Sequence, residues 1–327
     1  MTHALPISVS TGPAAALASS HAGTPRPDRD QPTAPDPAGA DEVRFLSWNV
    51  RKGTYVKQAC EWIDERMPDV VMWQEFQRAD RARIEDWLGM ETYLAPPLPG
   101  SSNDNAILVR PGGPLAVTAE YEHRWAPWHA PANIEVRLHG DGGALSRHGL
   151  FLVSKHDCYW SALPRQIEAD WLTTLAKPGR LALIMGDWSG FPAGTDIDWK
   201  AVEDRAFYVN HTYLDGNGIR RTDDRADRTT TDAEFVDPAR WAADRLGQPR
   251  ALDPTTGYGP DKIRQAGPTR TDRAAMSAEL AAAITRFAVG DPVEHPELDW
   301  ISDHRPLELF LDRRALHMIV NRAPARS

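Results

Sequence analysis

The sequence predicts an α/β fold, organised as one large domain that follows a segment of different composition. Two observations support this prediction. From residue 43 onward, short apolar or alternating stretches typical of strands recur along the chain, with amphipathic helical stretches between them. Residues 41–312 contain no second linker and no repeat, and a segment of about 270 residues can still form one domain.

The predicted elements begin directly after residue 42. In 43–49, Val43 and Phe45 alternate with Leu46 and Trp48, which predicts a strand that ends at Asn49. A short amphipathic helix follows, then a Pro-Asp stop and a buried strand over 70–73 that ends on Gln-Glu. Further strands are expected at 104–110, 133–138, 148–156 and 181–187, helices within 161–176 and 269–290, and an inserted polar loop at 212–233.

Both ends of the chain are expected to lie outside the domain. Residues 1–40 are rich in Ala, Pro, Ser and Gly and contain no aromatic residue, so a disordered leader is expected. A cleaved secretory signal is the competing interpretation, but no Lys or Arg precedes Arg26 and no solid apolar core is present. Residues 313–327 are expected to form a C-terminal tail.

Composition excludes several classes of protein. No apolar run approaches the length of a membrane span. The formal charge of −9 argues against a protein that coats nucleic acid through a broad basic surface, although a local phosphate site with a bound cation remains compatible with it. Only two cysteines occur, which favours a reducing compartment. We therefore expect a cytoplasmic monomer, with secretion left open.

Polar side chains with a capacity for catalysis stand at the ends of the predicted strands. One such residue alone is usually a turn residue or a helix cap. Here they recur at five strand ends, and strands that run parallel end at one edge of a sheet. Carboxylate and amide oxygens suit Mg²⁺ or Mn²⁺ better than zinc, and histidines can move protons in phosphoester hydrolysis. The residues are Asn49, Glu75, His156, Asp187 and the pair Asp303-His304.

Six motifs in order resemble those of the endonuclease/exonuclease/phosphatase superfamily, which has the deoxyribonuclease I-like fold. The resemblance covers residues 43–311 and implies a four-layer α/β/β/α sandwich, with two packed mixed sheets and helices outside. The motifs are "LSWNV" (46–50), "PDVVMWQE" (68–75), "VSKHDCYWSALPRQIEADWL" (153–172), "LIMGDWSG" (183–190), "GPDKIRQAG" (259–267) and "ISDHRPLEL" (301–309).

The resemblance also implies roles for these residues. Glu75 would be the principal ligand of Mg²⁺ or Mn²⁺, with Asn49 and Asp303 close to the ion. His304 would contact the scissile phosphate or take the proton of water, and Asp261, on an adjacent strand, would fix its tautomer. Asp187 would orient the attacking water, and His156 would bind the phosphate or protonate the leaving group. Asn49 and Ser189 would contact the phosphate; the family pattern has Asn where this chain has Ser189.

The implied activity is that of a metal-dependent phosphodiesterase, a nuclease acting on DNA or RNA. One alternative is a phosphomonoesterase or lipid-headgroup phosphohydrolase, which the acidic charge favours. Another is a catalytically weakened binding module, of which Ser189 would be the sign. A nuclease needs basic or aromatic residues around its cleft, and "NVRKG" (49–53) and "RWAPWHA" (124–130) are candidates. Otherwise Trp125 and Trp128 simply pack within their loop.

Overall fold

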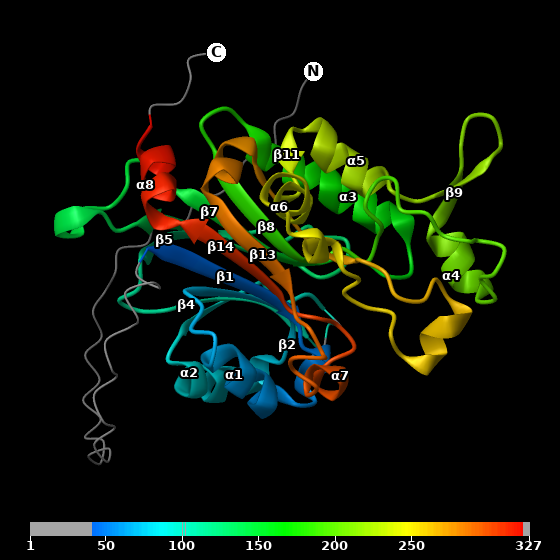
Figure 1. The fold of residues 1–327 in the computed structure, drawn as a ribbon, viewed down its shortest axis with the longest axis horizontal. Helices are drawn as coiled ribbons and strands as arrows, with labels where there is room; N and C mark the ends of the chain where they lie inside the picture. The colour runs from blue at the N-terminus through cyan, green and yellow to red at the C-terminus, as the bar shows by residue number, and fades with distance from the viewer. Residues whose placement is uncertain (1–40, 100, 102, 323–327) are drawn as a thin grey trace. The chain divides into compact units, whose positions relative to one another are not determined.

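The computed structural model describes residues 41–99, 101 and 103–322 (Figure 1). The predicted leader, 1–40, lies outside the described residues. Two six-stranded sheets form the centre of this part of the chain. The first has the order β13-β14-β1-β2-β4-β3 and the second the order β11-β12-β8-β7-β6-β5. A separate hairpin pairs β9 with β10.

The strands are defined as follows. The first sheet contains β1 (Glu42–Asn49), β2 (Val70–Phe76), β3 (Glu91–Leu94), β4 (Asp104–Val109), β13 (Ile284–Val289) and β14 (Leu307–Asp312). The second contains β5 (Leu115–Glu122), β6 (Ala132–Leu138), β7 (Leu150–His156), β8 (Leu181–Asp187), β11 (Phe235–Val236) and β12 (Asp272–Ser277), and the hairpin is β9 (Thr212–Leu214) with β10 (Arg220–Thr222). Each sheet is mixed, since β1–β2 and β7–β8 are parallel whereas the other pairs are antiparallel.

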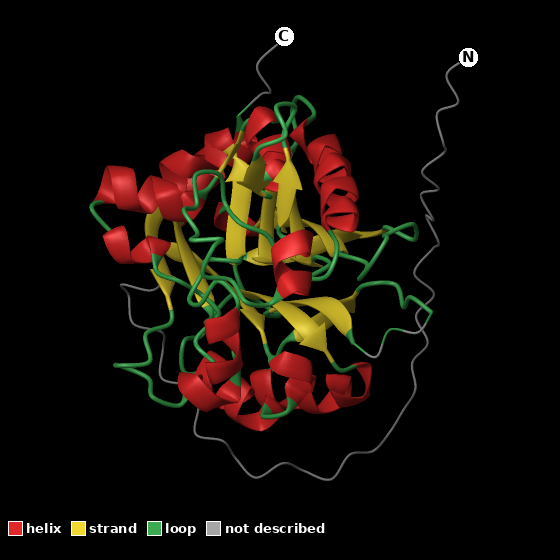
Figure 2. Cartoon of the chain, turned by 90° about the vertical axis from the view of Figure 1, so that its right-hand side faces the viewer, coloured by secondary structure: helices red, strands yellow, loops and turns green. Residues whose placement is uncertain are grey.

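Helices cover the outer faces of both sheets (Figure 2). The α-helices are α1 (Val56–Asp64), α2 (Arg81–Leu88), α3 (Ala162–Leu172), α4 (Arg205–Asn210), α5 (Arg225–Asp232), α6 (Pro238–Leu246), α7 (Leu298–Ile301) and α8 (Arg313–Asn321). Short 3₁₀ helices are η2 (Arg51–Gly53), η3 (Arg78–Asp80), η4 (Asp141–Gly143), η5 (Thr173–Ala176), η6 (Pro249–Leu252), η7 (Pro260–Arg264) and η8 (Ala278–Ala283).

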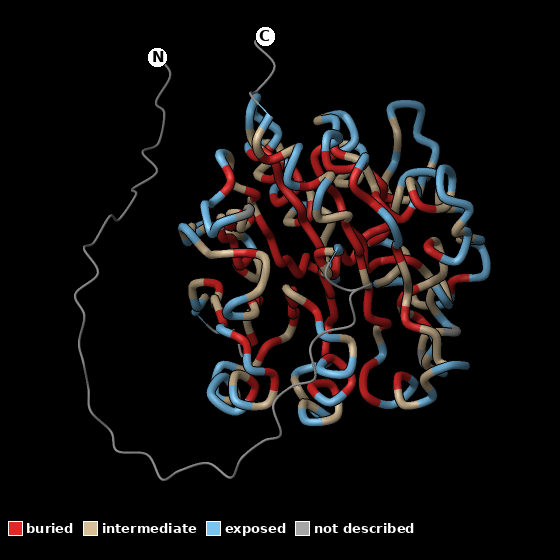
Figure 3. The backbone as a smooth tube through the Cα atoms, turned by 60° about the vertical axis from the view of Figure 1, so that its left-hand side comes forward, coloured by how far each residue is buried: buried red, intermediate tan, exposed pale blue. Residues whose placement is uncertain are grey.

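The alternation of side chains along each strand explains how the two sheets and the outer helices form layers. In β1, Val43 and Phe45 face the core between the sheets, whereas Leu46 and Trp48 face the core beneath α1 and α2. In β8, Leu183 and Met185 likewise point between the sheets, while Ala182 and Ile184 pack toward α3. Burial on both faces suits such near-continuous apolar strands, and the tube in Figure 3 is buried through its centre. The predicted four-layer α/β/β/α sandwich is confirmed.

Three segments differ from the predictions. Residues 269–290 were expected to contain a helix, but they form β12, η8 and β13; every residue of β12 is buried, and packing there outweighs the helix propensity of its alanines. The expected loop at 212–233 contains the β9–β10 hairpin and α5. In the expected tail, residues 313–321 form α8, which buries Leu316 and Val320 in the main core.

Among the described residues, no helix has the length and the apolar character needed to cross a membrane.

Candidate active site

The predicted strand-end residues come together at one end of the two sheets. Parallel strands β1 and β2 carry Asn49 and Glu75 near their ends, and parallel strands β7 and β8 end on His156 and Asp187. The antiparallel strand β14 begins at this same end, three residues after His304. The polar residues at the strand ends of both sheets therefore lie in a single site.

Three catalytic candidates of the second sheet lie side by side across its strands. We call His156, Asp187 and Asp272 the catalytic row. His156 is the register partner of Asp187 on one side, and Asp272 is its partner on the other. His156 Nε2 lies 3.4 Å from Asp187 Oδ2. The ring of His156 also stacks on that of His129, with centroids 4.9 Å apart. Asp187 thus occupies the middle of the row, where it is buried.

Asn49 connects the two sheets across this row. Its amide nitrogen donates to Asp187 Oδ2 over 3.3 Å and to Glu75 Oε1 over 3.4 Å, while its Oδ1 accepts from the backbone N–H of Arg51 at 3.1 Å. The Ser302 hydroxyl donates to the carbonyl of Asn49 at 2.7 Å and accepts from the His304 N–H at 3.2 Å. The first sheet therefore holds Asn49 and His304 at fixed positions relative to Asp187.

A buried carboxylate holds the imidazole of His304. Nδ1 of His304 lies 2.9 and 3.0 Å from the two carboxylate oxygens of Asp272, and Nε2 faces Asp187 Oδ2 at 3.9 Å. The Asp272 N–H donates to Thr255 Oγ1 at 3.0 Å, and the Trp48 indole donates to the His304 carbonyl at 2.9 Å. A carboxylate on Nδ1 fixes the tautomer and leaves Nε2 for chemistry.

The charges around this pair favour the imidazolium form. Burial alone would lower the pKa of His304, but the carboxylates of Asp272 and Asp187 outweigh it and raise that pKa to about 10. Burial would raise the pKa of Asp187, yet His304 and His156 more than compensate, so this pKa lies below its usual value. Asp187 is therefore an ionised acceptor opposite a cationic imidazole.

The sequence prediction for this carboxylate was wrong. It assigned the partner of His304 to Asp261 on an adjacent strand, whereas the structure has Asp272, the first residue of β12, in contact with the imidazole. The backbone of Asp261 belongs to the 3₁₀ helix η7 and not to a strand; its side chain lies outside the described part. The error came from assigning this motif to "GPDKIRQAG" (259–267), while residues 269–290, which contain Asp272, were expected to form a helix.

Backbone geometry directs two further side chains into the site. Glu75 has φ +59° and lies where the β2–β4 register shifts, which identifies a bulge. Ser189 has φ +46°, a left-handed conformation that Asn tolerates better than Ser. Its N–H and hydroxyl both donate to Asp187 Oδ1, at 2.7 and 3.2 Å. Ser189 thus orients Asp187 in this structure.

The residues present fit a divalent cation. Glu75 is half-buried beside the neutral amide of Asn49, and no Lys, Arg or His in the described ranges forms an ion pair with its carboxylate. Asp187, Asp272 and His304 also place ligand atoms within 4.8 Å of one another, although His304 can ligate a cation only as the neutral imidazole. Hard oxygens dominate both sets, as Mg²⁺ and Mn²⁺ require. Asp303, the third predicted ligand, is exposed, and its Oδ1 lies 3.9 Å from Arg51 Nε.

Solved structures provide the comparison with known proteins, since no family model and no curated protein matches the sequence. An endonuclease/exonuclease/phosphatase from Bacteroides vulgatus aligns with a TM-score of 0.56 and 14% identity, covering 83% of this chain and 98% of its own. The 3′ phosphatase NExo from Neisseria, bound to a product DNA hairpin, aligns at 0.55 with 15% identity, over 83% and 99%. An AP endonuclease from Archaeoglobus fulgidus gives 0.54 and 17%, over 83% and 99%. The chain has the endonuclease/exonuclease/phosphatase fold.

In this endonuclease/exonuclease/phosphatase fold, a cavity of about 360 Å³ opens directly beside the catalytic row. Glu75, His156, Asp187 and His304 are among the residues that line it. The rings of Tyr159, Trp160, Phe191 and Phe207 also line it, and we call it the aromatic cavity. Sequence analysis missed these four residues, because they belong to connections that carry no periodic pattern.

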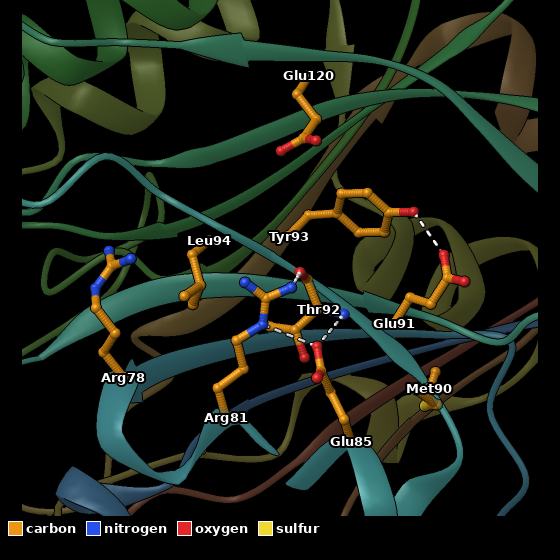
Figure 4. A pocket seen from close by; sticks show the side chains of 9 residues that line it. All are labelled: Arg78, Arg81, Glu85, Met90, Glu91, Thr92, Tyr93, Leu94 and Glu120. Atoms are coloured by element: carbon orange, nitrogen blue, oxygen red, sulfur yellow. Dashed lines mark hydrogen bonds and ion pairs between the residues drawn. The ribbon is translucent and has the colours of Figure 1, made fainter. Parts of the chain in front are cut away.

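A larger cavity of about 720 Å³ lies elsewhere, around β3 (Figure 4). Two of its charged side chains form ion pairs: Arg81 with Glu85 at 2.9 Å, and Arg78 with Asp104 at 2.9 Å. Tyr93 donates to Glu91 at 2.9 Å. None of the strand-end residues lines this cavity, so it is separate from the candidate active site.

Proposed function

We propose that the chain is a divalent-metal-dependent phosphoesterase that hydrolyses phosphodiester bonds, with DNA or RNA as its substrate class. The observation that carries the proposal is the His304–Asp272 pair, whose free Nε2 faces Asp187 next to Asn49 and Glu75. Support comes from the structural neighbours, which include an AP endonuclease and a 3′ phosphatase bound to product DNA.

The arrangement divides the chemistry among these groups. Glu75, with Asn49 beside it, would hold Mg²⁺ or Mn²⁺, which when bound offsets negative charge on the transferring phosphate. Asp187 is ionised, buried and held by two donors from Ser189, so it can orient a water and accept its proton. The His304 imidazolium would donate to a phosphate oxygen as charge develops. His156, at the edge of the row, is placed to bind the phosphate or protonate the leaving oxygen.

Basic and aromatic residues around the site favour nucleic acid over a lipid headgroup. Arg51 and Lys52 are exposed directly after Asn49. On the other side, Trp128 packs edge-on against Tyr159 and Trp160, with ring centroids 6.1 and 5.6 Å away. Such a combination binds a phosphate backbone and stacks on unpaired bases. These residues support the choice of nucleic acid, and we propose that Arg51, Lys52 and Trp128 contact the substrate.

The central test of this proposal is metal dependence. On a panel of single-stranded DNA, duplex DNA, RNA and a generic phosphodiester, we expect chelation to abolish whatever hydrolysis occurs, and Mg²⁺ or Mn²⁺ to restore it. Glu75→Gln should lower turnover by about 10²-fold or more, because the carboxylate charge that holds the cation is lost while its shape remains. Steady-state rates at saturating Mg²⁺ measure this, and Glu279→Gln, an exposed carboxylate in η8, is the matched control.

Activity that survives exhaustive chelation would contradict the proposed function. If phosphomonoesters alone were hydrolysed, the chain would be a phosphomonoesterase. Nucleic-acid binding without hydrolysis of any substrate would identify a binding module.

A second prediction concerns Ser189. Replacement by Asn should raise turnover on a phosphodiester by less than the roughly 10²–10³-fold worth of one well-placed donor, because the longer amide can reach the phosphate and the left-handed φ of +46° suits Asn. The free energy of unfolding should change little. Turnover and urea midpoints measure the two effects. An unchanged rate would show that position 189 does not face the phosphate, and a sharp loss would show that the enzyme needs the space left by Ser.

A further inference from the structure

The aromatic cavity is more than an extension of the phosphate site. Phe191 is buried, and its ring lies 6.3 Å from that of Phe207 and 5.5 Å from the imidazole of His211. Phe207 and His211 stack with centroids 4.1 Å apart. Burial lowers the pKa of His211 to about 4, so this wall is uncharged at neutral pH. Uncharged aromatic rings therefore line part of the cavity.

Two other rings that line the aromatic cavity are exposed and do not belong to the hydrophobic core. Tyr159 is 61% exposed and Trp160 is 45% exposed, although both line a cavity that contains catalytic side chains. Large exposed aromatic residues at a concave site are typical of ligand contact rather than of core packing. Their position after β7, three and four residues beyond His156, ties them to the catalytic row.

Polar groups complete the wall. Lys262, Gln265 and Asp204 also line the cavity, and the amide of Gln265 donates to Asp204 Oδ2 at 2.9 Å. Ring faces together with donors and acceptors match a heterocyclic base, which presents two flat faces and a polar edge. A lipid chain would instead bury these polar groups against hydrocarbon, which costs free energy.

The aromatic cavity is also small, and the part of its wall formed by Thr256 and Gly257 is closely packed. A volume of about 360 Å³ is near the lower limit for ligand pockets, so it suits one nucleotide and not a segment of duplex. Thr256 bridges both Thr269 and His304, and the adjacent Gly257 approaches Gly267 so closely that a Cβ would lie 2.0 Å from its carbonyl oxygen. This wall therefore belongs to the same structure that positions the catalytic histidine.

We propose that the aromatic cavity binds the unpaired base of the nucleotide whose phosphate is attacked at the catalytic row. The inference rests on the proposed function and narrows it: the substrate is a nucleotide with a free base, either at the end of a single strand or as a small nucleotide. Base-paired nucleotides within a duplex are excluded, because their bases cannot enter the cavity without leaving the stack.

The first experiment measures binding without catalysis. AMP and ribose 5-phosphate share a phosphate and a sugar and differ only in the base. By isothermal titration calorimetry of the metal-free protein, we expect AMP to bind about tenfold or more tightly than ribose 5-phosphate, the order expected for stacking of one base. Trp160→Ala should remove about that factor for AMP alone, and Trp160→Phe should restore most of it. Trp125→Ala is the matched control, since Trp125 is 88% exposed and does not line the cavity.

The second experiment measures hydrolysis with Mg²⁺. A dinucleoside monophosphate has one scissile bond, and two analogues each lack one of its bases. For one of the two analogues, we expect kcat/KM to be at least about tenfold lower than for the complete dinucleotide. In Trp160→Ala, the complete dinucleotide and that analogue should have equal kcat/KM. Rates on the dinucleotide and on a mononucleotide phosphodiester, thymidine 5′-(p-nitrophenyl phosphate), separate a strand end from a small nucleotide as the source of the base.

The two proposals can fail separately. Equal binding of AMP and ribose 5-phosphate, together with equal cleavage of all three dinucleotides, would overturn the base site while leaving the phosphodiesterase intact. Preferential, Trp160-dependent binding of AMP without hydrolysis of any substrate would support the base site and remove the proposed activity.

Discussion

His304→Ala and Asp272→Asn should each lower turnover on the order of 10²–10⁴-fold, the range for loss of a positioned acid–base group. His304 supplies the charged donor, and Asp272 holds it through Nδ1 at 2.9 Å. An Asn in place of Asp272 can offer its amide nitrogen to Nδ1 and so select the wrong tautomer. Because the two residues act as one unit, the double variant should be hardly worse than the more severe single variant.

Turnover numbers of the four proteins, measured with saturating Mg²⁺, form a double-mutant cycle. Asp253→Asn serves as the control, because this partly exposed carboxylate pairs only with surface Arg250 among the described residues. Circular dichroism and urea midpoints must show that each variant is folded. If the two single losses multiplied in the double variant, His304 and Asp272 would act independently, and the dyad would be contradicted.

Gly186→Ala is expected to give the largest loss of stability, about 3 kcal/mol or more. Gly186 lies in β8 with φ +150°, and a Cβ there would be 2.0 Å from the carbonyl oxygen of Lys155. That atom belongs to the backbone of β7, the parallel partner at this register position, so no side chain can move to make room. Two central strands would have to separate immediately before Asp187.

A graded series of glycine substitutions isolates the cause. Gly216→Ala meets no atom within 4 Å and has no positive φ, so its free energy of unfolding should stay unchanged. Gly112→Ala also meets no atom but has φ +71°, and should cost about 1–2 kcal/mol. Urea unfolding of all three measures the differences. A Gly186 variant no less stable than the Gly112 variant would show that the close approach of the strands is unimportant.

Much of the site could be predicted because strand ends are visible in a sequence. Val70–Trp73 and Leu181–Met185 are apolar enough to define buried strands, and a polar residue that follows such a run is conspicuous. Asn49, Glu75, His156 and Asp187 were found in this way, and His304 because it stands just before the strand at 307–311. The structure brings the five together. The roles assigned to them remain predictions.

Asp272 was missed for a physical reason. Its strand reads Asp-Arg-Ala-Ala-Met-Ser, and alanine-rich sequence favours a helix when local propensity alone is considered. Between β8 and β11 the small side chains instead fill a position buried on both faces. The aromatic cavity was missed because Tyr159, Trp160, Phe191 and Phe207 are spread over connections whose path depends on tertiary packing.

The shared register of His156, Asp187 and Asp272 sets which changes in chain length this protein can accept. Successive side chains of a strand point to opposite faces, so one residue inserted or deleted within β7, β8 or β12 would turn the catalytic side chain of that strand away from the other two. Segments that do not pair with these strands, such as residues 190–234 before β11, meet no such restriction from the pairing itself. Changes of length that alter substrate preference should therefore accumulate in these segments, while the number of residues in the three strands stays constant.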